Sequence, residues 1–342
     1  MTTHYTASFG PHTVSDRAQD GDRQLVALMV EQSMDGAGGH CVAELSGAEH
    51  APCASGDAVE VRLDAGDGAV TVFTGEVTRS AATATAQRIE AQDAVAKLAR
   101  FECESTYEDV SLDFVMKDLI GRAGAAAGSV CSGPDVPFYA VHRGQRALGQ
   151  LRRLAAACGA DVFATGDGKV TVATPGQAGA AHVLTFGETV RTLEIESLTL
   201  PFDSVEVYGE GAASAKGSDK AHWLCTDLSG VSGKAKVDAK GTVSTGSVGD
   251  RPLLVRDGAL RSGSAAEASA KARMAWLASR RVGGFVEANG LPAVMAGSTL
   301  TIAKLPSAHA AKKLLDDAGP LRVRSVRHTL DRESGLVTRI EF

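Results

Sequence analysis

The sequence predicts a β-rich α+β protein, and three observations support this class. The chain has 342 residues, which exceeds the usual size of a single hydrophobic core. Its 38 glycines and its low aromatic content of 5% favour many short elements joined by glycine turns. Short alternating apolar stretches dominate both ends of the chain, whereas helical spacing appears in its middle. We therefore expect two strand-rich units on either side of a smaller α+β unit.

Composition and charge narrow the class of protein further. The proportions of 44% hydrophobic and 22% charged residues are those of an ordinary globular protein. A formal net charge of −6 disfavours overall attraction to nucleic acid or to an anionic membrane, although a local basic patch stays open. Residues 1–10 lack the features of a signal peptide, and no stretch approaches the ~18 apolar residues of a membrane helix. We expect cytoplasmic synthesis, no membrane insertion and no nucleic-acid specificity.

Residues 1–100 are predicted to form a first small barrel or sandwich. Apolar and polar residues alternate over 59–63, which places one face of a strand in a core. Partner strands are expected over 69–76 and near 88–91, after a glycine-rich turn. Asp93 can then cap a short helix, because a carboxylate accepts hydrogen bonds from the first free backbone N–H groups.

Residues 101–184 are predicted to form a mixed middle unit. Apolar residues recur at helical spacing over 112–123 and over 148–158, and each run is followed by a glycine suited to a left-handed C-terminal cap. Residues 161–174 then predict a hairpin that turns at a Gly-Asp-Gly sequence. Two helices and a hairpin make this unit α+β.

Residues 185–342 are predicted to form a second strand-rich unit with an exposed polar insertion around residues 211–247. Ser264 followed by Glu267 matches a capping box and predicts the start of a helix there. Four residues of this helix are expected to face a core: Ala268, Ala272, Ala275 and Trp276. Strands are expected over the later apolar stretches, at residues 283–288, 298–303, 321–328 and 336–342.

One cluster has the composition of a metal site. His40, Cys41, His50 and Cys53 lie within a short stretch and carry zinc-binding side chains. His40 and Cys41 are adjacent in a predicted strand, so their side chains point to opposite faces and do not converge easily. Loop and core roles are favoured, while zinc and a Cys41–Cys53 disulfide remain alternatives. The six cysteines have no regular spacing, so we expect most of them to be reduced and buried.

The other charged groups are interpreted as surface or structural residues. Two carboxylate pairs are expected to be solvated: Glu102 with Glu104, and Asp316 with Asp317. The arginines are interpreted as a solvated face or a subunit contact: Arg152 with Arg153, Arg280 with Arg281, and Arg322 with Arg324 and Arg327. His142 and His328 are interpreted as structural. The sequence contains no Gly-x-Ser-x-Gly or His-Glu-x-x-His motif, so we assign no catalytic, cofactor-binding or metal residues and expect no enzyme.

Several segments, taken in order, carry the pattern of a known family. Residues 56–61 and 72–77 match a Gly-x-x-Val-x-Val strand and a Phe-x-Gly-x-Val hairpin, and residues 110–124 and 148–172 match its two middle helices and a hairpin. The later segments also match: 205–209, the alanine-rich helix from 265, 290–302 and 321–342. Together they resemble the baseplate hub family of contractile tails. That family includes the phage late control protein D, the myophage hub and the first half of the type VI secretion spike protein VgrG.

The resemblance implies an architecture and a set of partners. It implies two tail-tube-like β-barrel domains flanking the α+β middle domain, in a homotrimer whose six barrels match a hexameric inner tube. The partners would be the inner tube protein, a trimeric spike protein and other baseplate components of a tail or injection particle. We expect the spike and any lytic enzyme to be separate proteins. The alternative is a carbohydrate-binding or cell-wall-degrading tail component, which would need acidic residues about 5 to 10 Å apart in a cleft.

Overall fold

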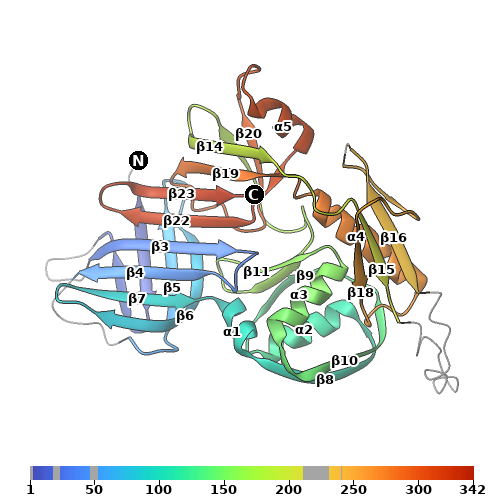
Figure 1. Ribbon diagram of the computed structural model, residues 1–342. Coiled ribbons are helices and arrows are strands. Elements are labelled where there is room, and N and C mark those ends of the chain that lie inside the picture. The colour runs from blue at the N-terminus through green and yellow to red at the C-terminus, as the bar shows by residue number, and fades with distance from the viewer. Residues whose placement is uncertain (1–2, 18–23, 47–52, 211–230, 240) are drawn as a thin grey trace.

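The computed structural model describes residues 3–17, 24–46, 53–210, 231–239 and 241–342. Within these ranges the chain forms several sheets and five helices, so the predicted β-rich α+β class is confirmed. Figure 1 shows the largest sheet on one side of the molecule, the helical middle part below it, and a smaller sheet with one long helix at the other end. None of the helices in the described ranges is long and apolar enough to cross a membrane.

The largest sheet joins the two ends of the chain. Seven of its eleven strands come from the first predicted unit: β1 (His4–Phe9), β2 (His12–Ser15), β3 (Leu25–Ser33), β4 (His40–Ser46), β5 (Ala58–Asp64), β6 (Val70–Ala82) and β7 (Ala86–Gln92). Four come from the last: β14 (Val190–Ser197), β19 (Val282–Asn289), β22 (Ser325–Asp331) and β23 (Gly335–Glu341). The strand order is β14-β19-β23-β22-β3-β4-β7-β6-β5-β1-β2.

Strands β3 and β22 form the seam between the two sets. They pair antiparallel, with Ser33 opposite Ser325 and Ala27 opposite Asp331. One sheet therefore crosses from the first predicted unit to the third, and closure into a barrel is not detected among the described residues. The domain boundaries at residues 100 and 184 stay a prediction.

Strand β5 shows why the pattern of the sequence places this sheet correctly. Val59, Val61 and Leu63 are buried, whereas the intervening Glu60 and Arg62 are exposed. Side chains along a strand alternate between its two faces, so this spacing puts every apolar residue in the core. The alternation predicted from the sequence is confirmed.

The middle part contains three helices packed around one core. Asp93 caps α1 (Ala94–Arg100) by accepting a 2.9-Å hydrogen bond from the backbone N–H of Val95, as predicted. The predicted helices α2 (Leu112–Arg122) and α3 (Ala147–Ala157) are also present, and Gly124 and Gly159 follow them with positive φ. The strands of this part are β8 (Glu102–Ser111), β9 (Ala127–Val130), β10 (Asp135–Arg146), β11 (Asp161–Ala164) and β12 (Val170–Ala173). Strands β11 and β12 form the predicted hairpin.

A four-stranded sheet covers one face of α4 (Gly263–Ala278). Its strands are β15 (Ser204–Tyr208), β16 (Ser232–Val237), β17 (Val243–Thr245) and β18 (Pro252–Arg256). The segment predicted as an exposed polar insertion, around 211–247, contributes two strands to this sheet: Gly233 and Ala235 of β16 are buried, whereas the residues of β17 are exposed or partly buried, and residues 211–230 lie outside the described ranges. Gly233 makes the fit possible, because a side chain there would come within 2.3 Å of the α4 backbone at Ala266.

Helix α4 exists as predicted, but its start and its buried face differ from the prediction. The N-cap is Ser262, whose hydroxyl accepts a 3.2-Å hydrogen bond from the Ala265 N–H, and not Ser264. The buried face contains Ala266, Ala270 and Met274, whereas the four residues predicted to face a core are exposed or only partly buried: Ala268, Ala272, Ala275 and Trp276. Alanines occupy all sides of this helix, so hydrophobic spacing could not select the face.

A further three-stranded sheet and a short helix complete the fold. The sheet contains β13 (Ala181–Thr185), β20 (Thr299–Ala303) and β21 (Leu321–Arg322), and α5 (Ala311–Ala318) lies near it in sequence. The strand predicted over 321–328 is divided into β21 and β22, which belong to different sheets. Arg322 ends β21, and Arg324 lies directly before β22.

Candidate functional site

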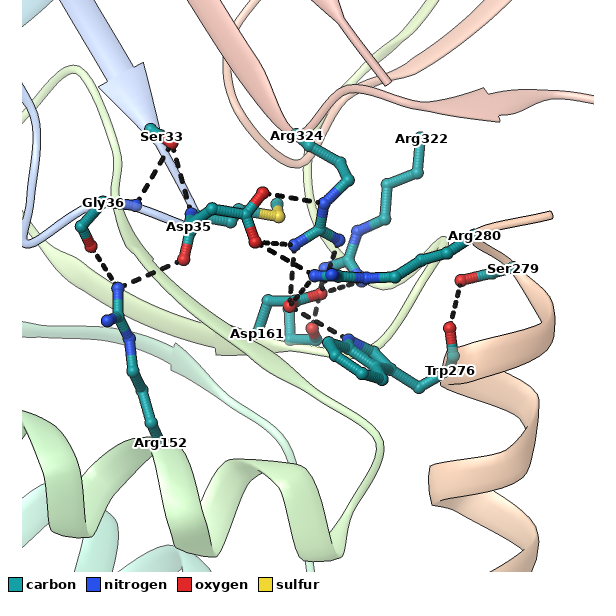
Figure 2. Close-up of polar contacts among 12 residues, drawn as sticks. Ser33, Asp35, Gly36, Arg152, Asp161, Trp276, Ser279, Arg280, Arg322 and Arg324 are labelled. Carbon is teal, nitrogen blue, oxygen red and sulfur yellow. Dashed lines mark hydrogen bonds and ion pairs between the residues drawn. The ribbon is translucent and has the colours of Figure 1, made fainter. Parts of the chain in front are cut away.

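A cluster of charged side chains lies where distant parts of the chain meet (Figure 2). It comprises Asp35, Asp161, Arg280, Arg322 and Arg324, and we call it the junction cluster. These residues come from the β3–β4 loop, the start of β11, the end of α4 and the β21–β22 segment. The junction cluster thus links the large sheet, the middle part and the α4 unit at one point.

Asp161 is the centre of the junction cluster. Its carboxylate accepts hydrogen bonds from Arg322 Nη1 at 2.7 Å, Trp276 Nε1 at 3.0 Å and Arg324 Nη2 at 3.3 Å. The side chains of Asp161, Arg322 and Arg324 are only 7%, 9% and 12% exposed. Burial of charge is costly unless every charged group is well paired, so these contacts must form together.

Asp35 closes the outer side of the junction cluster. It accepts hydrogen bonds from Arg324 Nη2 at 2.8 Å and Arg280 Nη2 at 3.0 Å, and its side chain is 56% exposed. Burial acts to raise the pKa of Asp35, but the hydrogen bonds and charges of Arg324 and Arg280 outweigh it and hold that pKa below its ordinary value. The Arg280 guanidinium also lies 4.0 Å from the centre of the Trp276 ring, a cation–π contact.

The junction cluster contains three guanidiniums and two carboxylates, so one positive charge is in excess. Burial disfavours the charged forms of Arg280 and Arg322 and lowers the pKa of both. Burial also acts on Arg324, but hydrogen bonds to Asp35 and the charge of Asp161 outweigh it and raise its pKa. The cluster is therefore a strong electrostatic link that carries a net positive charge.

Two further contacts hold the same region. Arg152 of α3 donates hydrogen bonds to the Met34 carbonyl, at 3.2 Å, and to the Gly36 carbonyl, so α3 is tied to the β3–β4 loop (Figure 2). The buried carboxylate of Asp257 accepts hydrogen bonds from Arg153 of α3 at 3.2 Å and from Arg273 of α4 at 3.1 Å. Ionic contacts thus fix the middle part to both of its neighbours.

The interpretation as a solvated face was wrong for Arg322 and Arg324, whose side chains are 9% and 12% exposed, and Arg280 also pairs within the chain, while a subunit contact stays a prediction. Their partners are Asp35 and Asp161, which lie up to 289 residues away in the sequence. No local sequence pattern predicts such pairs, and the only indication in the sequence was the number of arginines in these segments. Arg327 does fit the predicted solvated face, since its side chain is 49% exposed and pairs with Glu31.

The His40–Cys53 cluster has the strand geometry expected from the sequence. Cys41 is buried in the sheet core, and burial raises the pKa of its thiol to about 12, whereas His40 lies on the opposite face of β4 and is only partly buried. Cys53 approaches the Phe9 carbonyl at 3.6 Å, and His50 lies outside the described residues. Within the described ranges, no three His, Cys, Asp or Glu side chains gather as a metal site. The five cysteines that the structure describes form no disulfide with one another.

The remaining predicted residues divide into exposed and buried groups. The carboxylates predicted to be solvated are exposed: Glu102, Glu104, Asp316 and Asp317. His142 is exposed on β10, whereas His328 is buried in the large sheet with Nδ1 3.0 Å from the Thr338 hydroxyl. Burial lowers the pKa of His328 to about 4, so the ring is neutral at physiological pH.

Comparison with known proteins rests on solved structures. No protein-family model matches the sequence, and no curated protein matches it. The 43 kDa tail protein of prophage MuSo2 from Shewanella oneidensis has a TM-score of 0.66 at 14% identity, with 99% of this chain and 98% of that chain covered. The tail protein from Neisseria meningitidis MC58 has a TM-score of 0.68 at 14% identity, with 100% and 96% covered. The chain has the fold of a phage tail protein.

A third structure connects this fold to secretion machines. The E. coli c3393 protein is described as a component of the type VI secretion system with structural similarity to the T4 bacteriophage tail proteins gp27 and gp5. It has a TM-score of 0.51 at 11% identity, with 95% of this chain and 74% of that chain covered. The resemblance to the hub family found in the sequence is thus confirmed at the level of the fold.

Proposed function

We propose that the chain is a non-enzymatic baseplate hub, a trimeric symmetry adaptor that joins a hexameric inner tube to a trimeric spike. The observation that carries this proposal is the end-to-end match to two tail proteins, one of them from a prophage, which covers 99% and 100% of the chain. A tail protein that shares only one domain would match over part of the chain. The whole architecture, including the middle part, is therefore that of a tail component.

The edges of the large sheet support an assembled state. Strands β2 and β14 end the strand order, and each pairs on one side only within the described residues. Unpaired strand edges invite pairing with another chain, and a closed ring of subunits would cover them.

The junction cluster fits the mechanical task of an adaptor. A hub that presents two β-units to a sixfold tube must hold its parts in fixed positions; the β3–β22 pairing joins the two units in one sheet, and the junction cluster fixes the middle part and α4 against that sheet. Asp161 of the middle part binds Arg322 and Arg324 next to the large sheet and Trp276 of α4. Paired buried charges allow few alternative arrangements, so this centre favours one relative orientation.

The proposed partners are the inner tube protein, the trimeric spike and other baseplate components. Assembly would take place in the cytoplasm before the chain becomes part of a tail or injection particle. The chain itself would form the collar between the tube and the spike, with no catalytic step.

Light scattering on the purified chain, alone and with tube and spike proteins from neighbouring genes, tests the proposal. We expect a particle of three times the 35.2-kDa chain mass that binds both partners. A stable monomer that binds neither partner would contradict it. Release of dye from labelled cell wall by the purified chain would instead support the wall-degrading alternative.

A further inference from the structure

A cavity of about 510 Å³ lies beside the junction cluster, between the end of α4, strand β14 and the α5–β21 segment. Its volume falls in the range of ligand-binding pockets, about 300 to 1,000 Å³. The cavity is bounded on one side by the end of β14, an edge strand of the large sheet, and its arginine lining is the feature of the described chain that the hub role leaves unexplained.

The lining of this cavity combines positive charge with apolar surface. Four arginines line it: Arg280, Arg281, Arg322 and Arg324. Asp317 is the one acidic side chain among the described lining residues. The apolar wall is provided by Leu198, Val282, Leu314, Leu321 and Phe342, together with alanines and prolines.

The acidic side chains that the structure describes in the junction cluster do not fully compensate its arginines. The junction cluster already holds one guanidinium more than its carboxylates can pair. The Nε atoms of Arg280 and Arg322 are buried and have no hydrogen-bond acceptor among the described residues. Burial lowers the pKa of both arginines, which means that the site would be stabilised by an added negative charge. Guanidiniums bind carboxylates with particular strength because their planar N–H groups match the two oxygens.

We propose that this cavity binds an acidic peptide segment of a partner protein, with a carboxylate near the arginines and a neighbouring apolar side chain against Leu314 and Phe342. The proposal rests on the proposed function only in that a tail component would supply the segment. The size of the cavity and its mixed lining favour a peptide over a small anion, since a small anion would leave the apolar wall uncovered.

Binding of a defined dipeptide to the purified chain tests the proposal. The probe is N-acetyl-leucyl-glutamate amide, and its matched control is the glutamine analogue, which has the same shape without the charge. A dissociation constant of about 0.1 to 1 mM is within reach of a ligand of this size and is measurable by saturation-transfer NMR. We expect saturable binding of the glutamate peptide and binding at least about fivefold weaker for the glutamine peptide, the ratio that one partly exposed ion pair provides.

Variants locate the binding and separate it from loss of folding. Arg281→Gln should weaken binding about fivefold, whereas Asp317→Asn should strengthen it because it removes the opposing charge. Arg327→Gln, which removes an arginine outside the cavity, should leave the affinity unchanged. Equal affinity for the two peptides, no saturable binding, or equal affinity for acetate alone would overturn the proposal. None of these outcomes alters the trimer mass or the binding of tube and spike, so the hub proposal is tested independently.

Discussion

Asp161→Asn should be among the most damaging single substitutions of a charged residue in this protein. The change keeps the shape of the side chain and an acceptor for Trp276, but it removes the charge that pairs with Arg322 at 2.7 Å and Arg324 at 3.3 Å. All three charged side chains are at most 12% exposed. Removal of one partner from a buried pair costs about 3 to 5 kcal/mol, because the other charge stays buried without compensation.

Asp35→Asn is the matched control, since it removes a carboxylate from the same cluster. Asp35 is 56% exposed, so solvent screens its contacts and the expected loss is about 0.5 to 1 kcal/mol. Both variants are compared by urea unfolding in a Trp223→Phe background, where Trp276 is the single remaining tryptophan and its fluorescence reports on the junction. We expect Asp161→Asn to lower the free energy of unfolding by at least about 2 kcal/mol more than Asp35→Asn. Equal losses would refute the argument that burial makes Asp161 the centre of the cluster.

Three further predictions concern other positions. The pKa of His328 is about 4 in the folded chain and about 6.5 in the unfolded chain, so its contribution to the free energy of unfolding is present above pH 6.5, and about 3 kcal/mol of it is lost as the pH falls to 4. Urea titrations above pH 6.5 and at pH 4 should show that a His328→Gln variant lacks this pH dependence. Gly159→Ala should lower the free energy of unfolding by more than about 2 kcal/mol, because φ is +66° and the new methyl group would lie 2.5 Å from a carbonyl oxygen of α4. The control Gly176→Ala, where φ is +82° and the space is open, should cost about 1 kcal/mol, and equal losses in thermal unfolding would contradict the close approach at Gly159. Ser262→Ala should lower the free energy of unfolding by about 1 kcal/mol, and Ser264→Ala should have a smaller effect, because Ser262 is the residue that caps α4. A larger loss for Ser264→Ala would instead support the capping box predicted from the sequence.

Local signals in the sequence located the elements that depend on local physics. The alternation over 59–63, the Asp93 cap and the two glycines after α2 and α3 all lie where they were predicted. Each of these signals acts within a few residues, through strand alternation, a capping hydrogen bond or a left-handed backbone. The fold class and the three central helices could therefore be read before the structure was known.

Contacts between distant segments explain what the sequence did not reveal. Strand β16 occurs in a segment rich in glycine, serine and lysine, and it is a strand because β15 and α4 cover it. The buried face of α4 is chosen by that same sheet, since its alanines mark no side. The pairing of Arg322 and Arg324 with Asp161 depends on a chain separation of more than 160 residues, which no short motif encodes.

In the proposed hub, three copies of this chain imitate a sixfold collar. An electron cryomicroscopy reconstruction of the chain bound to its tube and spike proteins tests this arrangement. We expect a ring of three subunits, with the strands β3–β7 and the strands β19, β22 and β23 of each subunit facing successive tube subunits. A ring of six copies, or a single copy at the side of the tube, would contradict it.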